Sequence, residues 1–202
     1  FAHHEQIPYE NMHAVSVTGR PWHELDRALL ECRPLIGVLT DHVHTPRAIA
    51  KRMMEYHLDK DYTMRVAEHL GNPKKEKIYN IYSIEEISEM SFSCPNCALL
   101  MKAPNSTQQR PTLGIPDTKF VLLNDRAKMI TKAPIRVIDL SLLELHNSRT
   151  FWDIGACTGS VSIEARRQYP HLNIQAFEVR EECKDIIRAN ARLHSAPGID
   201  LH

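Results

Sequence analysis

Five consecutive segments in the second half of the chain constrain the fold most strongly. An apolar run at residues 150–154 leads into a small-residue loop at 155–159 and then into a helical pattern over 161–169. A second apolar run at 174–178 ends on an acid, and a helical pattern over 181–194 follows. Strands that alternate with helices at this spacing predict parallel strands with crossover helices. We therefore expect a partial doubly wound, Rossmann-like α/β sheet in this region.

The loop Gly155-Ala-Cys-Thr-Gly159 stands where such sheets bind their ligands, beyond the carboxyl end of a strand. A dinucleotide fold has the third glycine of G-x-G-x-x-G, whereas Gly159 closes this loop four residues after Gly155. That spacing favours S-adenosylmethionine as the cofactor. Glu178 ends the next predicted strand, where an acid can accept hydrogen bonds from ribose hydroxyls. The alternative interpretation is an ordinary strand-to-helix turn with Glu178 at a solvated strand end.

Two further residues extend the candidate site. Asp153 is expected to be buried beside the loop, to brace it and to approach the methionine amino group of the cofactor. Thr131 precedes a predicted helix over 133–145, and capping of that helix is favoured over contact with the cofactor. The predicted apolar side of that helix consists of Ile135, Ile138, Leu142 and Leu145. The predicted cofactor-binding residues are Thr131, Asp153, Gly155, Ala156, Cys157, Thr158, Gly159 and Glu178. The pattern identifies no catalytic residue and predicts no metal site.

Composition divides the chain into a first domain at 1–103, a linker at 104–112 rich in polar residues and proline, and a second domain at 113–202. In the first domain, Thr45 is expected to cap a helix, and Ser83 with Glu86 has the spacing of a capping box. The predicted strands of this domain cover 14–17, 35–39, 64–68, 77–82 and 97–101, and its predicted helices cover 22–30, 46–56 and 83–88.

Charge and hydropathy limit the classes of partner that the chain is expected to bind. The 25 Lys and Arg residues balance 25 Asp and Glu residues, so the chain lacks the basic field of a nucleic-acid binder. It has no apolar run of membrane-spanning length and no signal-peptide pattern, so we expect no membrane partner and a cytoplasmic location. Five cysteines without an export signal indicate reduced thiols. The chain is expected to be a piece of a longer protein, and assembly into a homo-oligomer stays open.

Two other clusters suggest chemistry less specifically. Cys94-Pro-Asn-Cys97 has the spacing of a redox pair or half of a zinc site, but no second pair completes four ligands. The ligand types of Asp41, His42 and His44 suit a metal. A loop that leads into a helix is favoured for these three residues, ahead of a substrate contact and then a metal.

The motifs resemble a known family. Thr150-Phe-Trp-Asp-Ile-Gly-Ala-Cys-Thr-Gly-Ser-Val-Ser-Ile-Glu-Ala165, preceded by Leu113-Gly-Ile-Pro-Asp117 and Ile130-Thr-Lys132, resembles the C15-methylating, decarboxylating unit of precorrin-6Y methyltransferases. The first domain resembles the C-terminal α/β domain of the tetrapyrrole methylase that acts at C5. Four segments carry this second resemblance, namely 15–21, 38–50, 68–73 and 91–97.

The resemblance implies methyl transfer from S-adenosylmethionine to C5 and C15 of a precorrin tetrapyrrole, with loss of carbon dioxide from the ring C acetate, in cobalamin and porphyrin biosynthesis. In the C15 unit, the family's contacts to the cofactor map to Thr131, to 155–159 and to Glu178. In the C5 unit, the nearest matching positions are Thr40 and Leu70. Two alternatives to this function stay open. The chain could be an inactive fragment or scaffold, or it could be a methyltransferase for a protein or RNA.

One residue departs from the family pattern. Family members usually have glycine where this chain has Cys157. If the backbone there takes a positive φ, the Cβ atom costs about 1 kcal/mol, which a folded domain tolerates. If the thiol points at the adenosine, the affinity for the cofactor is expected to fall.

Overall fold

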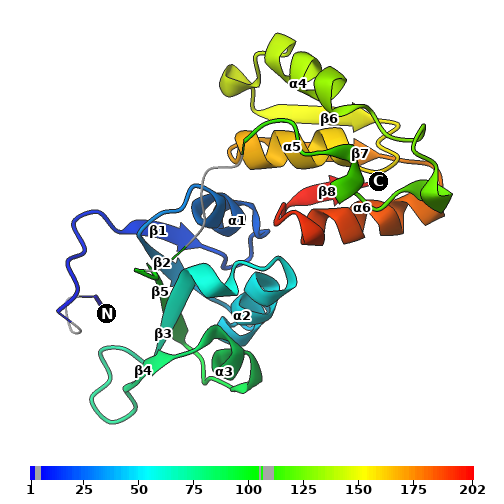
Figure 1. The fold of residues 1–202 in the computed structure, drawn as a ribbon. Coiled ribbons are helices and arrows are strands. Elements are labelled where there is room, and N and C mark those ends of the chain that lie inside the picture. Colours follow the sequence, from blue (N-terminus) through cyan, green and yellow to red (C-terminus); the bar gives the residue numbers. More distant parts are fainter. Residues whose placement is uncertain (3–5, 105, 107–111) are drawn as a thin grey trace. The chain divides into compact units, whose positions relative to one another are not determined.

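A computed structural model describes residues 1–2, 6–104, 106 and 112–202. It divides into two compact units, at residues 1–108 and 109–202, which Figure 1 shows in sequence colours. Most of the predicted linker at 104–112 lies outside the described residues. Among the residues that the structure describes, no helix is both long and apolar enough to span a membrane.

The first unit is a five-stranded sheet with helices packed on one face (Figure 1). The strand order is β1-β2-β5-β3-β4, with β1 parallel to β2 and every other pair antiparallel. The strands are β1 (His13–Ser16), β2 (Leu35–Leu39), β3 (Tyr62–Glu68), β4 (Lys77–Tyr82) and β5 (Asn96–Lys102), and the helices are α1 (His23–Leu30), α2 (Pro46–Glu55) and α3 (Ile84–Glu89).

The core of this unit follows from strand register. Val15, Val38, Ala98 and Val66 are partners across four adjacent strands, so their side chains meet on one face, where all four are buried. Both predicted caps are confirmed. Thr45 accepts a hydrogen bond from the Ala48 amide at the start of α2, and the capping box of Ser83 begins α3.

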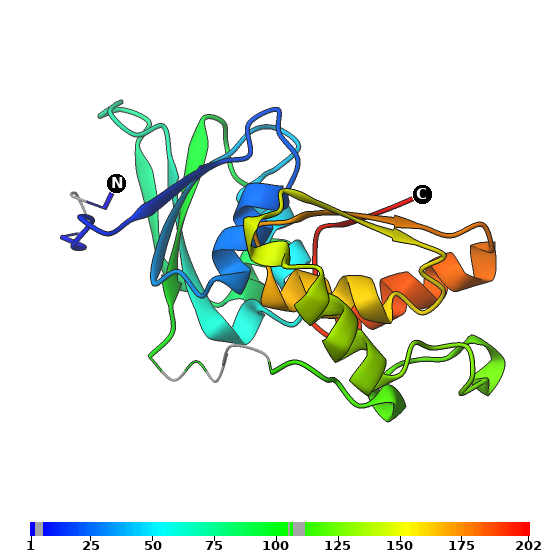
Figure 2. The same ribbon diagram turned by 90° about the horizontal axis from the view of Figure 1, so that it is seen from above.

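The second unit is a parallel sheet in the order β6-β7-β8, which confirms the predicted α/β alternation. Figure 2 shows its three helices on one face of the sheet, and α5 contacts both α4 and α6. The elements are β6 (Thr150–Ile154), β7 (Asn173–Phe177), β8 (Ile199–Leu201), α4 (Ala133–Leu142), α5 (Ser160–Gln168) and α6 (Glu181–Leu193).

The predicted orientation and length of α4 are wrong. The helix ends at Leu142, because Glu144 takes a left-handed backbone with φ of 49°. Of its predicted apolar row, Ile135, Ile138 and Leu142 point outward, and Leu142 is 76% exposed. Leu145 lies after the helix and is buried as expected, and within the helix Arg136 and Leu140 are the buried residues. The helix turns this way because the charge of Arg136 has its partners on the inner side, where it pairs with Glu164.

Candidate cofactor-binding site

The loop between β6 and α5 is shaped by two glycines. Gly155 has φ of 83°, a conformation that side chains rarely adopt, and a Cβ atom added there would meet nothing within 4 Å. Gly159 has φ of 70° and precedes the first residue of α5. A Cβ atom on Gly159 would stand 2.9 Å from Ile187 of α6, so glycine permits the close approach of the loop to that helix.

The same loop is joined to the end of β7. The amides of Gly155 and Ala156 both donate to the Phe177 carbonyl, at 2.9 and 3.1 Å. The next amide, of Cys157, donates to Oε2 of Glu178 at 2.9 Å. The predicted loop and the predicted acid are therefore in direct contact.

Glu178 follows β7 and is only 5% exposed. Arg180 donates to it from its backbone amide and from Nε, both at 3.0 Å to Oε1, and from Nη2 at 2.9 Å to Oε2. The side chain of Arg180, together with backbone donors that include the Cys157 amide, lowers the pKa of Glu178 to about 2. The carboxylate is ionised at neutral pH, and its four acceptor positions are occupied within the chain.

Asp153, at the end of β6, is held by the first turn of α5. Its Oδ2 accepts hydrogen bonds from the Ser162 hydroxyl at 2.6 Å and from the Ser162 amide at 3.2 Å. Burial raises the pKa of Asp153 above its ordinary value, against the opposite effect of these two bonds. An acid in this place can accept a hydrogen bond from a cationic amino group.

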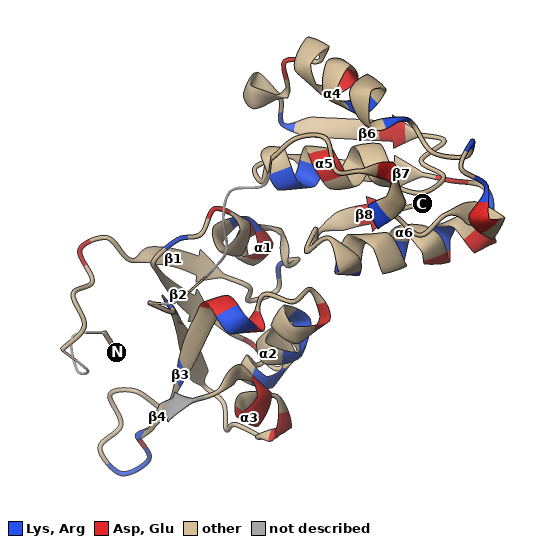
Figure 3. Ribbon diagram, viewed as in Figure 1, with Lys and Arg blue, Asp and Glu red and all other residues tan. Residues whose placement is uncertain are grey.

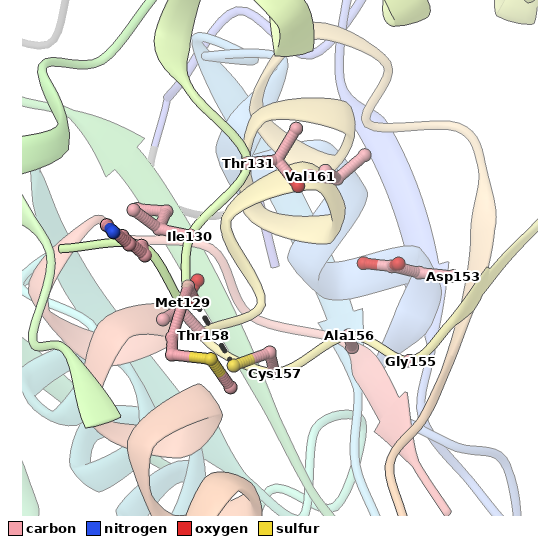
Figure 4. Close-up of a pocket in the computed structure, with 10 residues that line it drawn as sticks. Met129, Ile130, Thr131, Asp153, Gly155, Ala156, Cys157, Thr158 and Val161 are labelled. Carbon is pink, nitrogen blue, oxygen red and sulfur yellow. Dashed lines mark hydrogen bonds between the residues drawn. The ribbon is translucent and has the colours of Figure 1, made fainter. Parts of the chain in front are cut away.

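A cavity of about 270 Å³ lies beside Asp153 and the loop (Figure 4). Its size is close to the lower end of about 300 Å³ for small-molecule pockets. One wall is residues 128–131, and the other comes from β6, the loop and the start of α5. The Cys157 thiol crosses between the walls and donates to the Met129 carbonyl at 3.1 Å, the dashed line in Figure 4.

The expectation that Thr131 caps α4 is wrong. The N-cap of this helix is Lys132, which makes no side-chain cap bond, and Oδ1 of Asp117 instead accepts from the Ala133 amide at 3.0 Å. A carboxylate from a distant segment therefore replaces the local cap. Thr131 lines the cavity.

The structure brings most of the predicted site residues together. Gly159 and Glu178 do not line the cavity. Gly159 lies against Ile187 of α6, and Glu178 accepts a hydrogen bond from the Cys157 amide of the loop. Cys157 has φ of 47°, so it takes the strained conformation that glycine would relieve. The predicted residues that line the cavity are Thr131, Asp153, Gly155, Ala156, Cys157 and Thr158.

Five residues of the site were not predicted as site residues. Lys128 and Met129 lie in irregular backbone before a helix, where no periodicity marks them. Ile130 entered only as part of the Ile130-Thr-Lys132 motif, and Val161 only as part of a helix. Arg180 follows Glu178 by two residues, and this spacing could have indicated an ion pair.

The other candidate clusters have local explanations. Asp41 accepts backbone bonds from Gly19, Val43 and His44 and contacts the His44 ring at 3.2 Å, so it organises its loop. Within the described ranges, no three His, Cys, Asp or Glu residues are arranged to hold a metal ion. Cys94 is exposed, whereas burial raises the pKa of Cys97.

A smaller hollow in the first unit contains the C5-type position Leu70. Its volume is about 130 Å³, and Leu70 lines it together with Ala67, Pro95, Asn96 and Cys97. The other C5-type position, Thr40, donates from its hydroxyl to the Asn96 carbonyl at 2.5 Å. Both positions are therefore next to one hollow.

Comparison with known proteins reveals relatives of this arrangement. The family model described as a precorrin methyltransferase domain matches residues 123–202. A cobalt-precorrin-6B C(15)-methyltransferase (decarboxylating) of Salmonella typhimurium is 39% identical over 72 residues, 36% of this chain and 38% of that protein. A precorrin-6Y C(5,15)-methyltransferase (decarboxylating) of Sinorhizobium is 27% identical over 188 residues, 93% of this chain and 44% of that protein.

A solved structure of a precorrin-6Y C5,15-methyltransferase from Geobacter metallireducens is 36% identical to this chain. It matches with a TM-score of 0.42 over 46% of this chain and 48% of that one. The chain thus spans less than half the length of the relatives named here.

The fold is that of an α/β methyltransferase, and the family model covers the part of it that contains the loop and Glu178. More particularly, residues 123–202 match the precorrin methyltransferase domain model, and the chain is similar over 93% of its length to a precorrin-6Y C(5,15)-methyltransferase (decarboxylating). The resemblance found in the sequence is confirmed.

Proposed function

We propose that the second unit binds S-adenosylmethionine in the cavity beside the 155–159 loop and serves methylation of precorrin-6Y at C15, with decarboxylation of the ring C acetate. The observation that carries the proposal is the bond from the amide of Cys157, a residue that lines the cavity, to the buried, ionised Glu178. Ribose hydroxyls need an acceptor, and a methionine ammonium needs an anion. Glu178 and Asp153 supply these groups.

The residues present fit this cofactor without a metal. Methyl transfer from a sulfonium releases a neutral thioether, so the main task of the protein is to align the methyl group with the nucleophilic carbon. A decarboxylation step benefits from exclusion of water and from a donor that stabilises the electron-rich ring. Thr131 and Asp153 both line the cavity (Figure 4), and their polar groups orient the cofactor there.

We propose that the first unit serves methylation at C5, with the hollow beside Leu70 as its part of a cofactor site. The reaction sequence belongs to cobalamin biosynthesis and takes place in the cytoplasm. Acidic and basic residues are interspersed in both units (Figure 3), and this distribution favours a tetrapyrrole over RNA as the substrate.

Calorimetry with S-adenosylmethionine tests the cofactor. The wild-type chain is expected to bind with a micromolar Kd, and Gly155→Arg is expected to abolish binding because its side chain would fill the open space beside the loop. Gly19→Arg is the matched control, since Gly19 also has a positive φ and no atom near a Cβ position. Millimolar binding by the wild type would support an inert scaffold instead, and loss of binding in both variants would contradict the placement of the cofactor beside the 155–159 loop.

Product mass tests the substrate. The complete protein with precorrin-6Y and S-adenosylmethionine is expected to yield a product that has gained two methyl groups and lost one carbon dioxide. An unchanged precorrin, together with methylation of an added protein or RNA, would contradict the substrate assignment.

A further inference from the structure

Arg136 of α4 is fully buried and bonds to three separate parts of the second unit. Its Nε donates to Oε1 of Glu164 at 2.9 Å, and its Nη1 donates to Oδ1 of Asp117 at 2.8 Å. The remaining donors reach the carbonyls of Thr131 and Ile115. A guanidinium can hold several acceptors at once because its donors form a rigid planar fork.

Glu164 and Asp117 extend these contacts to two irregular segments. Glu164 of α5 is 1% exposed and also accepts from the amides of Gly114 and Ile115, at 3.0 and 2.9 Å. Asp117 accepts from the Ala133 amide. The segment before α4 and the segment at 114–117 are therefore tied to α5, the helix that begins at the cofactor loop.

The wall of the cavity at 128–131 is held at two points. At its end, the Thr131 carbonyl accepts from Arg136. In its middle, the Met129 carbonyl accepts from the Cys157 thiol. Arg136 connects the Thr131 carbonyl to Glu164 of α5, the helix that begins on the opposite side of the cavity. Without Arg136, only the weak bond from the Cys157 thiol would remain of these two links.

We propose that the buried network of Arg136, Glu164 and Asp117 positions the 128–131 wall over the cavity and thereby determines the affinity for the cofactor. These are positioning residues, since none of the three lines the cavity. The inference rests on the proposed binding of S-adenosylmethionine for its effect on affinity. The position of the wall itself is measurable without any cofactor.

Two variants separate positioning from stability. Arg136→Met leaves Glu164 as a buried charge without its cation, so the second unit is expected to lose stability. In the double variant Arg136→Met with Glu164→Gln, both charges are gone and much of the stability is expected to return. The bond to the Thr131 carbonyl stays absent in both variants. Arg136→Lys retains the positive charge but lacks the planar fork of donors. Its affinity for the cofactor is therefore expected to lie between those of the wild type and Arg136→Met.

Alkylation of Cys157 by iodoacetamide, measured by peptide mass mapping, reports on the wall. The thiol lies against Met129, so release of the wall is expected to raise its labelling rate roughly tenfold in the double variant. Exposed Cys94 in the first unit is the reference, and near-ultraviolet circular dichroism reports unfolding. The Kd for S-adenosylhomocysteine, measured by calorimetry, is expected to weaken by a similar factor.

The outcomes are distinct. Faster Cys157 labelling and weaker binding in the stable double variant, with Cys94 labelling and the circular dichroism signal unchanged, support the proposal. Wild-type labelling or a wild-type Kd in the double variant overturns it, as does faster labelling that appears only together with loss of the circular dichroism signal. If the wild-type chain binds no S-adenosylhomocysteine, the proposed function fails, while the labelling still decides whether the network positions the wall.

Discussion

Glu178 has its full set of hydrogen-bond partners before any ligand arrives. Three of its four contacts come from Arg180, whose side chain is 37% exposed and can move into solvent, whereas the fourth comes from the Cys157 amide of the loop. Ribose hydroxyls must therefore compete with the guanidinium for the carboxylate. At the scale of single residues, the structure thus shows an acceptor that is ionised and oriented but already engaged.

Replacement of Arg180 tests that competition. Arg180→Met is expected to free two acceptor positions and to tighten binding of S-adenosylhomocysteine by a few-fold, as calorimetry can measure. Arg188→Met on the exposed part of α6 is the control, and an equal effect there would contradict the explanation.

The pH dependence of stability offers a second test at position 178. The pKa of Glu178 is lowered to about 2 from 4.5, so its contribution to stability is present above pH 4.5 and is lost as the pH falls towards 2. Glu178→Gln removes this contribution. The difference in unfolding free energy between wild type and variant is expected to shrink between pH 5 and 2, as urea unfolding can measure, and a constant difference would contradict the low pKa.

A comparison of two loop glycines separates backbone strain from crowding. Gly155→Ala introduces only the strain of a positive φ, about 1 kcal/mol, because its Cβ atom meets nothing. Gly159→Ala adds a contact with Ile187 at 2.9 Å and is expected to cost about 1–3 kcal/mol more in urea unfolding. The cost of Gly159→Ala should be smaller in an Ile187→Ala background, where both γ-carbons near the new Cβ atom are absent, and equal costs at both glycines would argue against crowding.

At the scale of elements, α5 is the connecting member of the second unit. Its start is the cofactor loop, its middle holds Glu164, and near its end the buried Arg166 donates to four carbonyls that precede β7 and β8. Those carbonyls belong to Pro170, Leu172, Pro197 and Gly198. One helix therefore aligns two strands with the loop.

Loss of Arg166 is expected to disorder these connections. Arg166→Met leaves buried carbonyls without donors, at about 1–3 kcal/mol for each unsatisfied group, so we expect loss of the cooperative unfolding of the second unit. Near-ultraviolet circular dichroism and calorimetric unfolding measure this. Arg167→Met is the neighbouring control, and a cooperative Arg166→Met transition at the wild-type temperature would refute the role of Arg166.

At the scale of the whole molecule, the described helices of the second unit leave one face of its sheet uncovered (Figure 2). Trp152 and Ile154 of β6 are 64% and 77% exposed, and Phe177 of β7 contacts Trp152 at 5.8 Å between ring centroids. Exposed apolar side chains grouped in this way are unusual on a monomer surface.

Fluorescence quenching tests that exposure. In a Trp22→Phe background, emission from Trp152 is expected to be quenched by acrylamide to nearly the extent of a free indole. In a Trp152→Phe background, Trp22 is the control, because it packs between His44 at 4.5 Å and Arg52 at 5.2 Å and should be protected. Strong protection of Trp152 would show that the sheet face is covered in solution.

The sequence by itself determined the local features of this protein. Helix caps such as Thr45, the alternation of β6, α5 and β7, and the loop from Gly155 to Gly159 were all predictable, since each depends on residues adjacent in the chain. The family resemblance could be recognised for the same reason, because a contiguous motif carries it.

Only the tertiary structure decided which sides of those elements face inward and what closes the cavity. The α4 helix buries Arg136 because Glu164 and Asp117, 28 and 19 residues away, place their charges on its inner side. The wall at Met129 has no periodic pattern, and its position depends on the Cys157 thiol opposite. Contacts between residues distant in the chain leave no local signal, so neither feature could be derived from sequence spacing.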